Sequence, residues 1–121
     1  MLFRSKNWVS FDRVFFQTGK ASLTPESKLQ LNNIATLLKN FPASSIKIGG
    51  YTDNTGDSVT NRRISEQRAR VVLQELIKSG AGARQLTEAS GYGSDYPVCP
   101  ANDTEECKAR NRRVDLKVSS K

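Results

Sequence analysis

Residues 45–56, with the sequence Ser-Ile-Lys-Ile-Gly-Gly-Tyr-Thr-Asp-Asn-Thr-Gly, join a short strand pattern to a turn pattern. Ile46 and Ile48 alternate with polar or small residues, which predicts a strand over residues 45–50 with one buried face. Residues 51–57 are rich in Asp, Asn, Thr and Gly, which favour turns closed by side-chain hydrogen bonds and tolerate positive φ. Asp53 therefore lies just beyond the end of a strand, where open α/β sheets place ligand-binding groups.

Two amphipathic helices are predicted on either side of this strand. Residues 24–26, Thr-Pro-Glu, combine a helix cap, a proline at the first helical position and an early acidic residue. Apolar residues then recur at helical spacing up to Pro42, which predicts a helix over residues 25–40. These apolar residues are Leu31, Ile34, Ala35, Leu38 and Phe41. A longer helix follows the turn and runs to Ser79, where two nearby glycines end it.

Three further strands complete the predicted fold. The strand patterns cover residues 8–16, 86–92 and 113–118, and residues 105–110 are long enough for a short helix. The order of elements is βαβαβ(α)β, and no linker or internal repeat divides the chain. We therefore predict one α/β domain over residues 1–121, with its core at about residues 8–118. In this two-layer sandwich the two main helices pack on a four-stranded mixed sheet.

The composition excludes several classes of protein. The 121 residues suffice for one hydrophobic core but not for two. Because there is no histidine, Ser-His and Cys-His nucleophile chemistry is absent, and no enzyme activity, metal or cofactor is predicted. The formal charge of +7 suits an anionic partner, but Lys and Arg are scattered and no nucleic-acid-binding motif is present. No apolar run is long enough to span a bilayer, so this chain is not expected to insert into a membrane.

Arg68 is unusual because it falls inside the apolar arc of the second helix. Steps of about 100° per residue put residues such as Ile64 and Ile77 on the buried side, together with Arg68. A buried guanidinium needs acceptors, and Asn61 lies on the same stripe. Arg68 is either a structural arginine paired with an internal carboxylate or one edge of a binding cleft. Asp53 is the expected carboxylate, although an Asp in this setting also forms turns with its own backbone.

The two cysteines, Cys99 and Cys107, lie eight positions apart in a stretch rich in loop-forming residues. We predict a disulfide between them. Free thiols or metal ligands are the alternatives, but two cysteines without histidine do not complete a tetrahedral zinc site. A disulfide also indicates an oxidising compartment.

Four motifs follow one another along the chain. They are Gly49-Gly50-Tyr51-Thr52-Asp53-Asn54-Thr55-Gly56 with the later Asn61, Ile64-Ser65-Glu66-Gln67-Arg68-Ala69, Gly91-Tyr92-Gly93, and Asn111-Arg112-Arg113-Val114. In this order they resemble the OmpA-like C-terminal domain, a family that includes the periplasmic parts of porin-type outer-membrane proteins, the peptidoglycan-associated lipoproteins and the flagellar stator protein MotB. The resemblance extends over about residues 8–118, nearly the whole chain.

The resemblance implies non-covalent binding of peptidoglycan through the meso-diaminopimelate of its stem peptide, without turnover. The family's ligand residues map onto Asp53, Arg68, Thr55, Asn61 and Arg112, with Thr52, Asn54, Tyr51 and Gln17 as further candidates. Tyr51 stands where the family often has His, and Gln17 where it often has Asp. Diaminopimelate carries a carboxylate beside its distal amine, so a receptor must offer it an anion and a cationic fork. Asp53 and Arg68 are expected to supply both, and to pair with each other in the empty domain.

The resemblance also indicates the expected context. A wall-binding domain tethers another part of its protein, so we expect this chain to be one domain of a longer outer-membrane or envelope protein. Its expected location is the periplasm of a Gram-negative bacterium. A homodimer formed through the full-length protein is left open. The alternative function is a domain of the same fold that binds another protein, or that anchors without recognising diaminopimelate.

Overall fold

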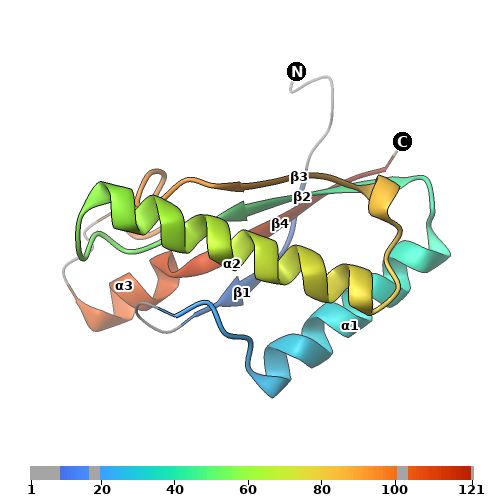
Figure 1. The fold of residues 1–121 in the computed structure, drawn as a ribbon, viewed down its shortest axis with the longest axis horizontal. Coiled ribbons are helices and arrows are strands. Elements are labelled where there is room, and N and C mark those ends of the chain that lie inside the picture. The colour runs from blue at the N-terminus through green and yellow to red at the C-terminus, as the bar shows by residue number, and fades with distance from the viewer. Residues whose placement is uncertain (1–8, 17–19, 101–103, 121) are drawn as a thin grey trace.

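The computed structural model describes residues 9–16, 20–100 and 104–120 (Figure 1). In these ranges the elements follow the predicted order: β1 Val9–Phe15, α1 Pro25–Asn40, β2 Ser44–Gly50, α2 Ser58–Lys78, β3 Leu86–Gly91, α3 Glu105–Asn111 and β4 Arg113–Ser120, with a 3₁₀ turn at Ala83–Gln85 before β3. Several boundaries differ from the predicted ones by a residue or two, which is the usual variation at the ends of helices and strands. Trp8, the predicted first residue of β1, lies outside the described residues.

The strands form one mixed sheet with the spatial order β1-β4-β2-β3. β2 and β3 are parallel, whereas β4 is antiparallel to both of its neighbours, β1 and β2. The predicted α/β class with a mixed sheet is confirmed. Because the last strand lies between the first two, Arg113 pairs with Phe15 on one side, and Val114 pairs with Gly50 on the other. The start of β4 therefore meets the ends of β1 and β2.

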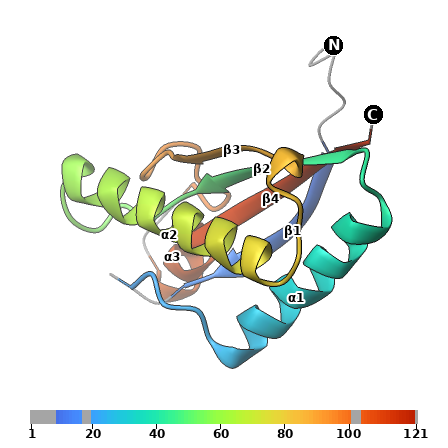
Figure 2. The same ribbon diagram turned by 45° about the vertical axis from the view of Figure 1, so that its right-hand side comes forward.

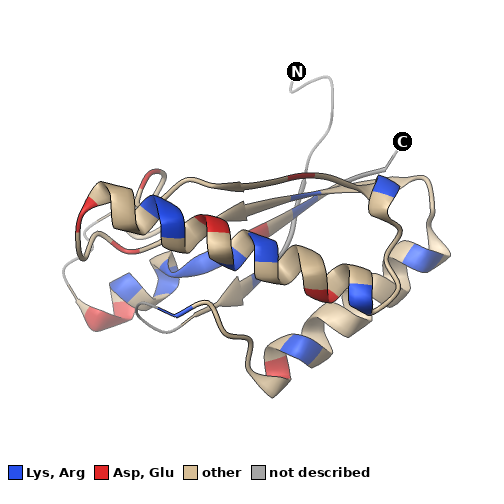
Figure 3. Cartoon of the chain, viewed as in Figure 1, with Lys and Arg blue, Asp and Glu red and all other residues tan. Residues whose placement is uncertain are grey.

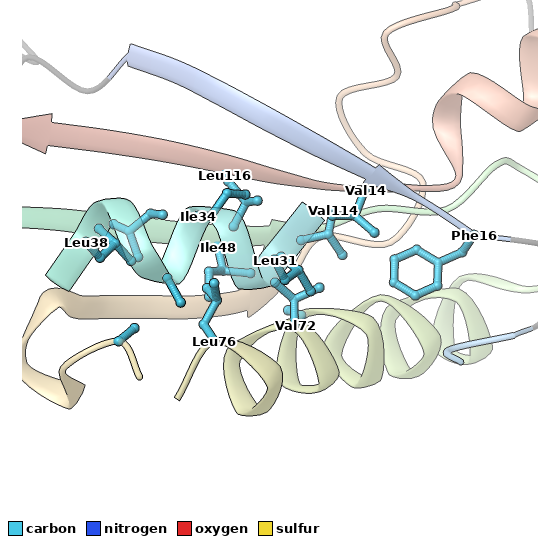
Figure 4. Packing of buried hydrophobic residues seen from close by; sticks show 14 residues of the cluster. Val14, Phe16, Leu31, Ile34, Leu38, Ile48, Val72, Leu76, Val114 and Leu116 are labelled. Atoms are coloured by element: carbon cyan, nitrogen blue, oxygen red, sulfur yellow. The ribbon is translucent and has the colours of Figure 1, made fainter. Parts of the chain in front are cut away.

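α1 and α2 cover the same face of the sheet (Figures 1 and 2), and the hydrophobic core lies between these helices and the strands. Figure 4 shows how side chains from both helices meet those of the strands. The most deeply buried apolar residues are Val14, Leu31, Ala35, Ile46, Ile48, Ala69, Val72, Leu76, Val114 and Leu116. None of the helices in the described part of the chain is long and apolar enough to cross a membrane.

Two residues that periodicity places on the buried helix stripes are exposed instead. Phe41 is 61% exposed and Ile77 is 45% exposed. Phe41 caps the end of α1, and Ile77 lies in the last turn of α2. Both residues lie at the C-terminal ends of their helices, where the helical pattern continues but the side chains face solvent.

α2 lies very close to the ends of β2 and β3. A Cβ atom at Gly50 would overlap the carbonyl oxygen of Ser65, and a Cβ at Gly91 would overlap the backbone nitrogen of Glu66. The two glycines therefore permit the contact, because no larger residue leaves room for the helix backbone. This packing brings the first half of α2 over the turn that follows β2.

Candidate ligand-binding site

Asp53 is buried just beyond β2 and uses both oxygens of its carboxylate. Oδ1 accepts a hydrogen bond from the Thr55 backbone N–H at 2.9 Å, which closes the predicted turn. Oδ2 accepts a hydrogen bond from Nη1 of Arg112 at 3.0 Å. Asp53 is thus both a turn former and a charge partner, with one oxygen for each role.

The pKa of the Asp53 carboxyl lies below its ordinary value. Burial disfavours the charged form and is the largest single influence, but it is outweighed by the hydrogen bonds from Thr55 and by the hydrogen bond and charge of Arg112. Asp53 is therefore an anion at neutral pH.

Arg112 is held by three acceptors, two of which come from distant parts of the chain. Its Nε donates to the Phe16 carbonyl at 3.0 Å, Nη1 donates to Asp53 at 3.0 Å, and Nη2 donates to Glu105 at 2.7 Å. Burial lowers the pKa of Arg112, but Glu105 and Asp53 outweigh it and raise that pKa overall. Glu105 was not predicted to belong to the site. The available signal was an acidic residue in the first turn of the short helix, seven positions before Arg112.

Arg68 points into the molecule, as its position on α2 predicts, and is only 1% exposed. Its Nε donates to the carbonyl oxygen of Lys20 at 2.7 Å, and its Nη1 donates to the carbonyl oxygen of Tyr51 at 3.0 Å. The guanidinium also lies over the Phe16 ring, 5.1 Å from its centroid. Burial, with a smaller contribution from the charge of Arg112, lowers the pKa of Arg68 to about 10, so the side chain stays cationic at neutral pH.

The expected direct pair between Asp53 and Arg68 is wrong. Within the described residues the ion-pair partner of Asp53 is Arg112, and Arg68 donates to backbone carbonyls instead. The reason is the strand order. β4 lies beside β2 in the sheet. Arg112, the residue just before β4, therefore lies next to the Asp53 carboxylate beyond the end of β2.

A small cavity of about 90 Å³ lies among these groups. It is lined by Thr52, Asp53, Thr55, Thr60, Asn61, Ile64, Arg68 and Arg112. The structure therefore brings together all five main candidates from the sequence, and Thr52 with them. Thr60 and Ile64 were missed, although both lie on the first turns of α2 beside Asn61.

Three lesser candidates fare differently. The Tyr51 ring does not line the cavity and stacks on Tyr92, with 5.4 Å between ring centroids. The Tyr51 carbonyl oxygen accepts the hydrogen bond from Arg68. Asn54 is exposed and does not line the cavity. Gln17 lies outside the described residues.

The predicted disulfide between Cys99 and Cys107 is confirmed. Asn111 reinforces it, because its Oδ1 accepts hydrogen bonds from the Val98 and Cys99 backbones and its Nδ2 donates to the Cys99 carbonyl. Cys107 and Asn111 both belong to α3, the helix that carries Glu105. The disulfide thus joins the segment at Cys99 to α3, the helix whose Glu105 binds Arg112.

The cavity combines one carboxylate with two guanidinium groups in a largely buried setting. Such a set suits a small ligand that carries both an ammonium and a carboxylate, since each ionic group finds an opposite charge. No group of three or more His, Cys, Asp or Glu side chains in the described ranges is placed to hold a metal ion. Elsewhere, basic residues lie on α1, α2 and α3 with acidic residues among them (Figure 3).

Solved structures share this fold. The peptidoglycan-associated lipoprotein from Burkholderia pseudomallei superposes with a TM-score of 0.83 at 32% identity, covering 88% of this chain and 88% of that one. The C-terminal domain of Helicobacter pylori MotB gives a TM-score of 0.83 at 28% identity, covering 92% of this chain and 86% of that domain.

Curated proteins that are similar in sequence come from the same group of envelope proteins. The probable lipoprotein YiaD of Escherichia coli is 37% identical over 108 residues, which are 89% of this chain and 48% of YiaD. The peptidoglycan-binding protein ArfA of Mycobacterium bovis is 37% identical over 113 residues, which are 93% of this chain and 34% of ArfA. The chain thus spans about half or less of these relatives. The family model that matches residues 15–112 is that of the OmpA family. Together with the solved structures, this match confirms the prediction that the domain is not an enzyme. The chain belongs to the OmpA family.

Proposed function

We propose that this domain binds peptidoglycan non-covalently and recognises the meso-diaminopimelate of the stem peptide. The observation that carries the proposal is the buried Asp53 carboxylate, which shares one cavity with the buried guanidinium groups of Arg68 and Arg112. Two relatives support the choice of polymer, since one is called a peptidoglycan-binding protein and the other a peptidoglycan-associated lipoprotein.

The chemistry of recognition follows from the charges. The distal end of diaminopimelate has an ammonium and a carboxylate on one carbon. The ammonium binds Asp53, which then shares its charge between the ligand and Arg112. The carboxylate binds the Arg68 guanidinium, whose planar donors match its two oxygens. Asn61, buried beside them, adds an amide that both donates and accepts hydrogen bonds.

The proposed role in the cell is to tether an envelope protein to the wall, with this domain in the periplasm. The relatives include a probable lipoprotein and an outer membrane porin, so the membrane attachment differs among proteins that share this domain. The domain is the common part, and it is the part that reaches the wall.

Two substitutions test the proposal in a pull-down with insoluble sacculi. Asp53→Asn removes the anion, and Arg68→Lys keeps the positive charge but loses the planar fork. We expect each to weaken binding at least about tenfold, since each leaves a ligand charge without its partner in a desolvated site. Arg70→Lys is the matched control, because Arg70 lies two residues further along α2 and is exposed.

Circular dichroism and thermal unfolding establish whether each variant is folded. If folded Asp53→Asn and Arg68→Lys proteins both bind sacculi as well as the parent, the domain does not recognise diaminopimelate through this cavity. That result favours the alternative of a protein-binding or anchoring domain with the same fold.

A further inference from the structure

We propose that Tyr51 is a positioning residue for ligand binding: its ring, held on the sheet face opposite α1 and α2, fixes the carbonyl oxygen that orients Arg68. This proposal rests on the proposed function, in which Arg68 binds the distal carboxylate of diaminopimelate. Tyr51 does not line the cavity, so it acts on the ligand through Arg68. It directly follows β2 and precedes Thr52 and Asp53, which both line the cavity.

Tyr51 connects the two faces of the sheet. A Cβ atom at Gly50 would overlap the backbone of α2. A Cβ at Gly49 would instead lie 3.2 Å from the Tyr51 hydroxyl oxygen and 3.2 Å from the Tyr92 ring. Because neighbouring residues of a strand point to opposite faces, the Tyr51 ring lies over Gly49 on the face that α2 does not cover. Its backbone carbonyl, in contrast, accepts the hydrogen bond from Nη1 of the buried Arg68 at 3.0 Å.

Two partners hold the Tyr51 ring. The guanidinium carbon of Arg113 lies 3.9 Å from the ring centroid. The Tyr92 ring stacks on the Tyr51 ring with 5.4 Å between centroids. Both kinds of contact are attractive, because an aromatic ring has a negative face and a positive edge. Tyr51 is also buried, so these contacts restrict its ring to one orientation.

Arg113 is a rigid partner for this ring. Its side chain is buried, its Nε donates to Asp115 at 3.1 Å, and its Nη2 donates to the carbonyl oxygen of Tyr96 at 3.0 Å. Arg113 and Tyr51 are also joined through their backbones. The Tyr51 N–H donates to the Arg113 carbonyl at 2.8 Å, and the Arg113 N–H donates to the Tyr51 carbonyl at 3.3 Å. One residue therefore holds both the ring and the backbone of Tyr51.

The Tyr51 carbonyl helps to set the plane of the Arg68 guanidinium. Nε of Arg68 donates to the Lys20 carbonyl at 2.7 Å, and Nη1 donates to the Tyr51 carbonyl at 3.0 Å. Because a guanidinium is planar, two fixed donors determine the orientation of the whole group. A carboxylate is bound best by parallel donors, so diaminopimelate depends on this orientation. Lysine has no distal carboxylate, and its binding does not depend on it.

Titration calorimetry tests the proposal with two stem tripeptides, one with diaminopimelate and one with lysine at the third position. The parent should prefer the diaminopimelate peptide at least about tenfold. Tyr51→Leu removes the ring, so it should reduce this preference about fivefold or more, with little change in affinity for the lysine peptide. Tyr51→Phe keeps the ring and should retain the preference. Tyr96→Leu is the matched control, because the Tyr96 ring is exposed and packs edge-on against Tyr92.

The NMR signal of the Arg68 Nε–H group provides a second measurement that needs no ligand. The hydrogen bond to Lys20 and the burial of Arg68 should protect this proton from exchange with water. Tyr51→Leu should speed up the exchange and shift the resonance, whereas Tyr51→Phe should do neither. If Tyr51→Leu does not fold, Tyr92→Leu takes its place. It removes one stacking partner of Tyr51 and should change the preference and the signal in the same direction.

Equal losses of affinity for the two peptides in folded Tyr51→Leu indicate a purely structural role and overturn the proposal. An Arg68 signal that stays unchanged in Tyr51→Leu, or in Tyr92→Leu where that variant replaces it, overturns the proposal as well. A parent domain that binds the two peptides equally overturns the proposed function instead. The Arg68 signal then decides by itself whether Tyr51 positions the guanidinium.

Discussion

Asp53 and Arg112, 59 residues apart in the chain, form a buried ion pair with Nη1 of Arg112 3.0 Å from Oδ2 of Asp53. Their side chains are 5% and 9% exposed. The other terminal nitrogen of Arg112 binds Glu105, whose side chain is 75% exposed. Arg112 therefore binds the Asp53 carboxylate inside the cavity and the Glu105 carboxylate at the surface. If a ligand binds Asp53, Glu105 still balances the positive charge of Arg112.

Removing Arg112 should strongly destabilise the domain. Arg112→Gln leaves Asp53 buried without its ion-pair partner, which is expected to cost about 3 to 5 kcal/mol of unfolding free energy. Urea unfolding followed by circular dichroism measures this loss. Glu105→Gln should cost at most about 1 kcal/mol, because Glu105 is largely exposed. Equal losses for the two variants contradict the buried position of the Asp53 pair.

The stability of the domain should depend on pH through Asp53. Because the folded-state pKa of this carboxyl is depressed, its contribution is fully present above the unfolded pKa of about 4 and is lost as the pH falls through the folded value. The difference in unfolding free energy between the parent and Asp53→Asn should therefore shrink as the pH falls from about 7 to about 2. Urea titrations across this range measure the difference, and a constant value rejects the linkage.

Gly50→Ala should disturb the packing of α2 on the sheet. The added Cβ meets the backbone carbonyl of Ser65, which does not move aside as a flexible side chain does. We expect a loss of about 3 kcal/mol or more, at the upper end of the range for overpacked sites. Gly82→Ala is the control, since the nearest atom to its Cβ belongs to the Gln85 side chain. Thermal unfolding compares the two, and similar melting temperatures for both variants argue against the close contact.

Loss of the disulfide should lower the unfolding free energy modestly and should also change the surroundings of Arg112. The bridge between Cys99 and Cys107 closes a short loop, so its removal in Cys99→Ser/Cys107→Ser should cost about 2 to 3 kcal/mol. Because Cys107 lies on the helix that carries Glu105, the changes in amide chemical shift between the parent and this variant should extend to Arg112. Shifts confined to the loop would show that α3 holds Glu105 in place without the bridge.

The cavity should distinguish the two common wall types. Lysine lacks the distal carboxylate of diaminopimelate, so it leaves the buried Arg68 guanidinium without its ligand partner. Affinity for lysine-type stem peptide should be at least about tenfold lower. Calorimetry at low and high salt makes the comparison, because attraction to the basic surface weakens with salt while the cavity contact persists. Equal affinities would mean that bulk charge or sugar is recognised instead.

Local patterns in the sequence predicted the elements and one inward side chain. The orientation of Arg68 follows from the helical repeat alone, because residues on one helix face share their surroundings whatever the helix packs against. The Asp53 turn is equally local, since its hydrogen bond reaches only two residues ahead. Phe41 and Ile77 show the limit of such patterns, because a helical stripe does not reveal which of its positions the rest of the fold covers.

The sequence by itself thus determined which residues carry charge at the end of β2 and on the inner face of α2. Only the tertiary structure decided how those charges pair. β4, the last strand in the chain, lies between β1 and β2, and this non-local pairing delivers Arg112 to Asp53 and leaves the backbone carbonyls of Lys20 and Tyr51 to Arg68. Strand order depends on contacts between segments about 60 to 110 residues apart, which no local periodicity encodes.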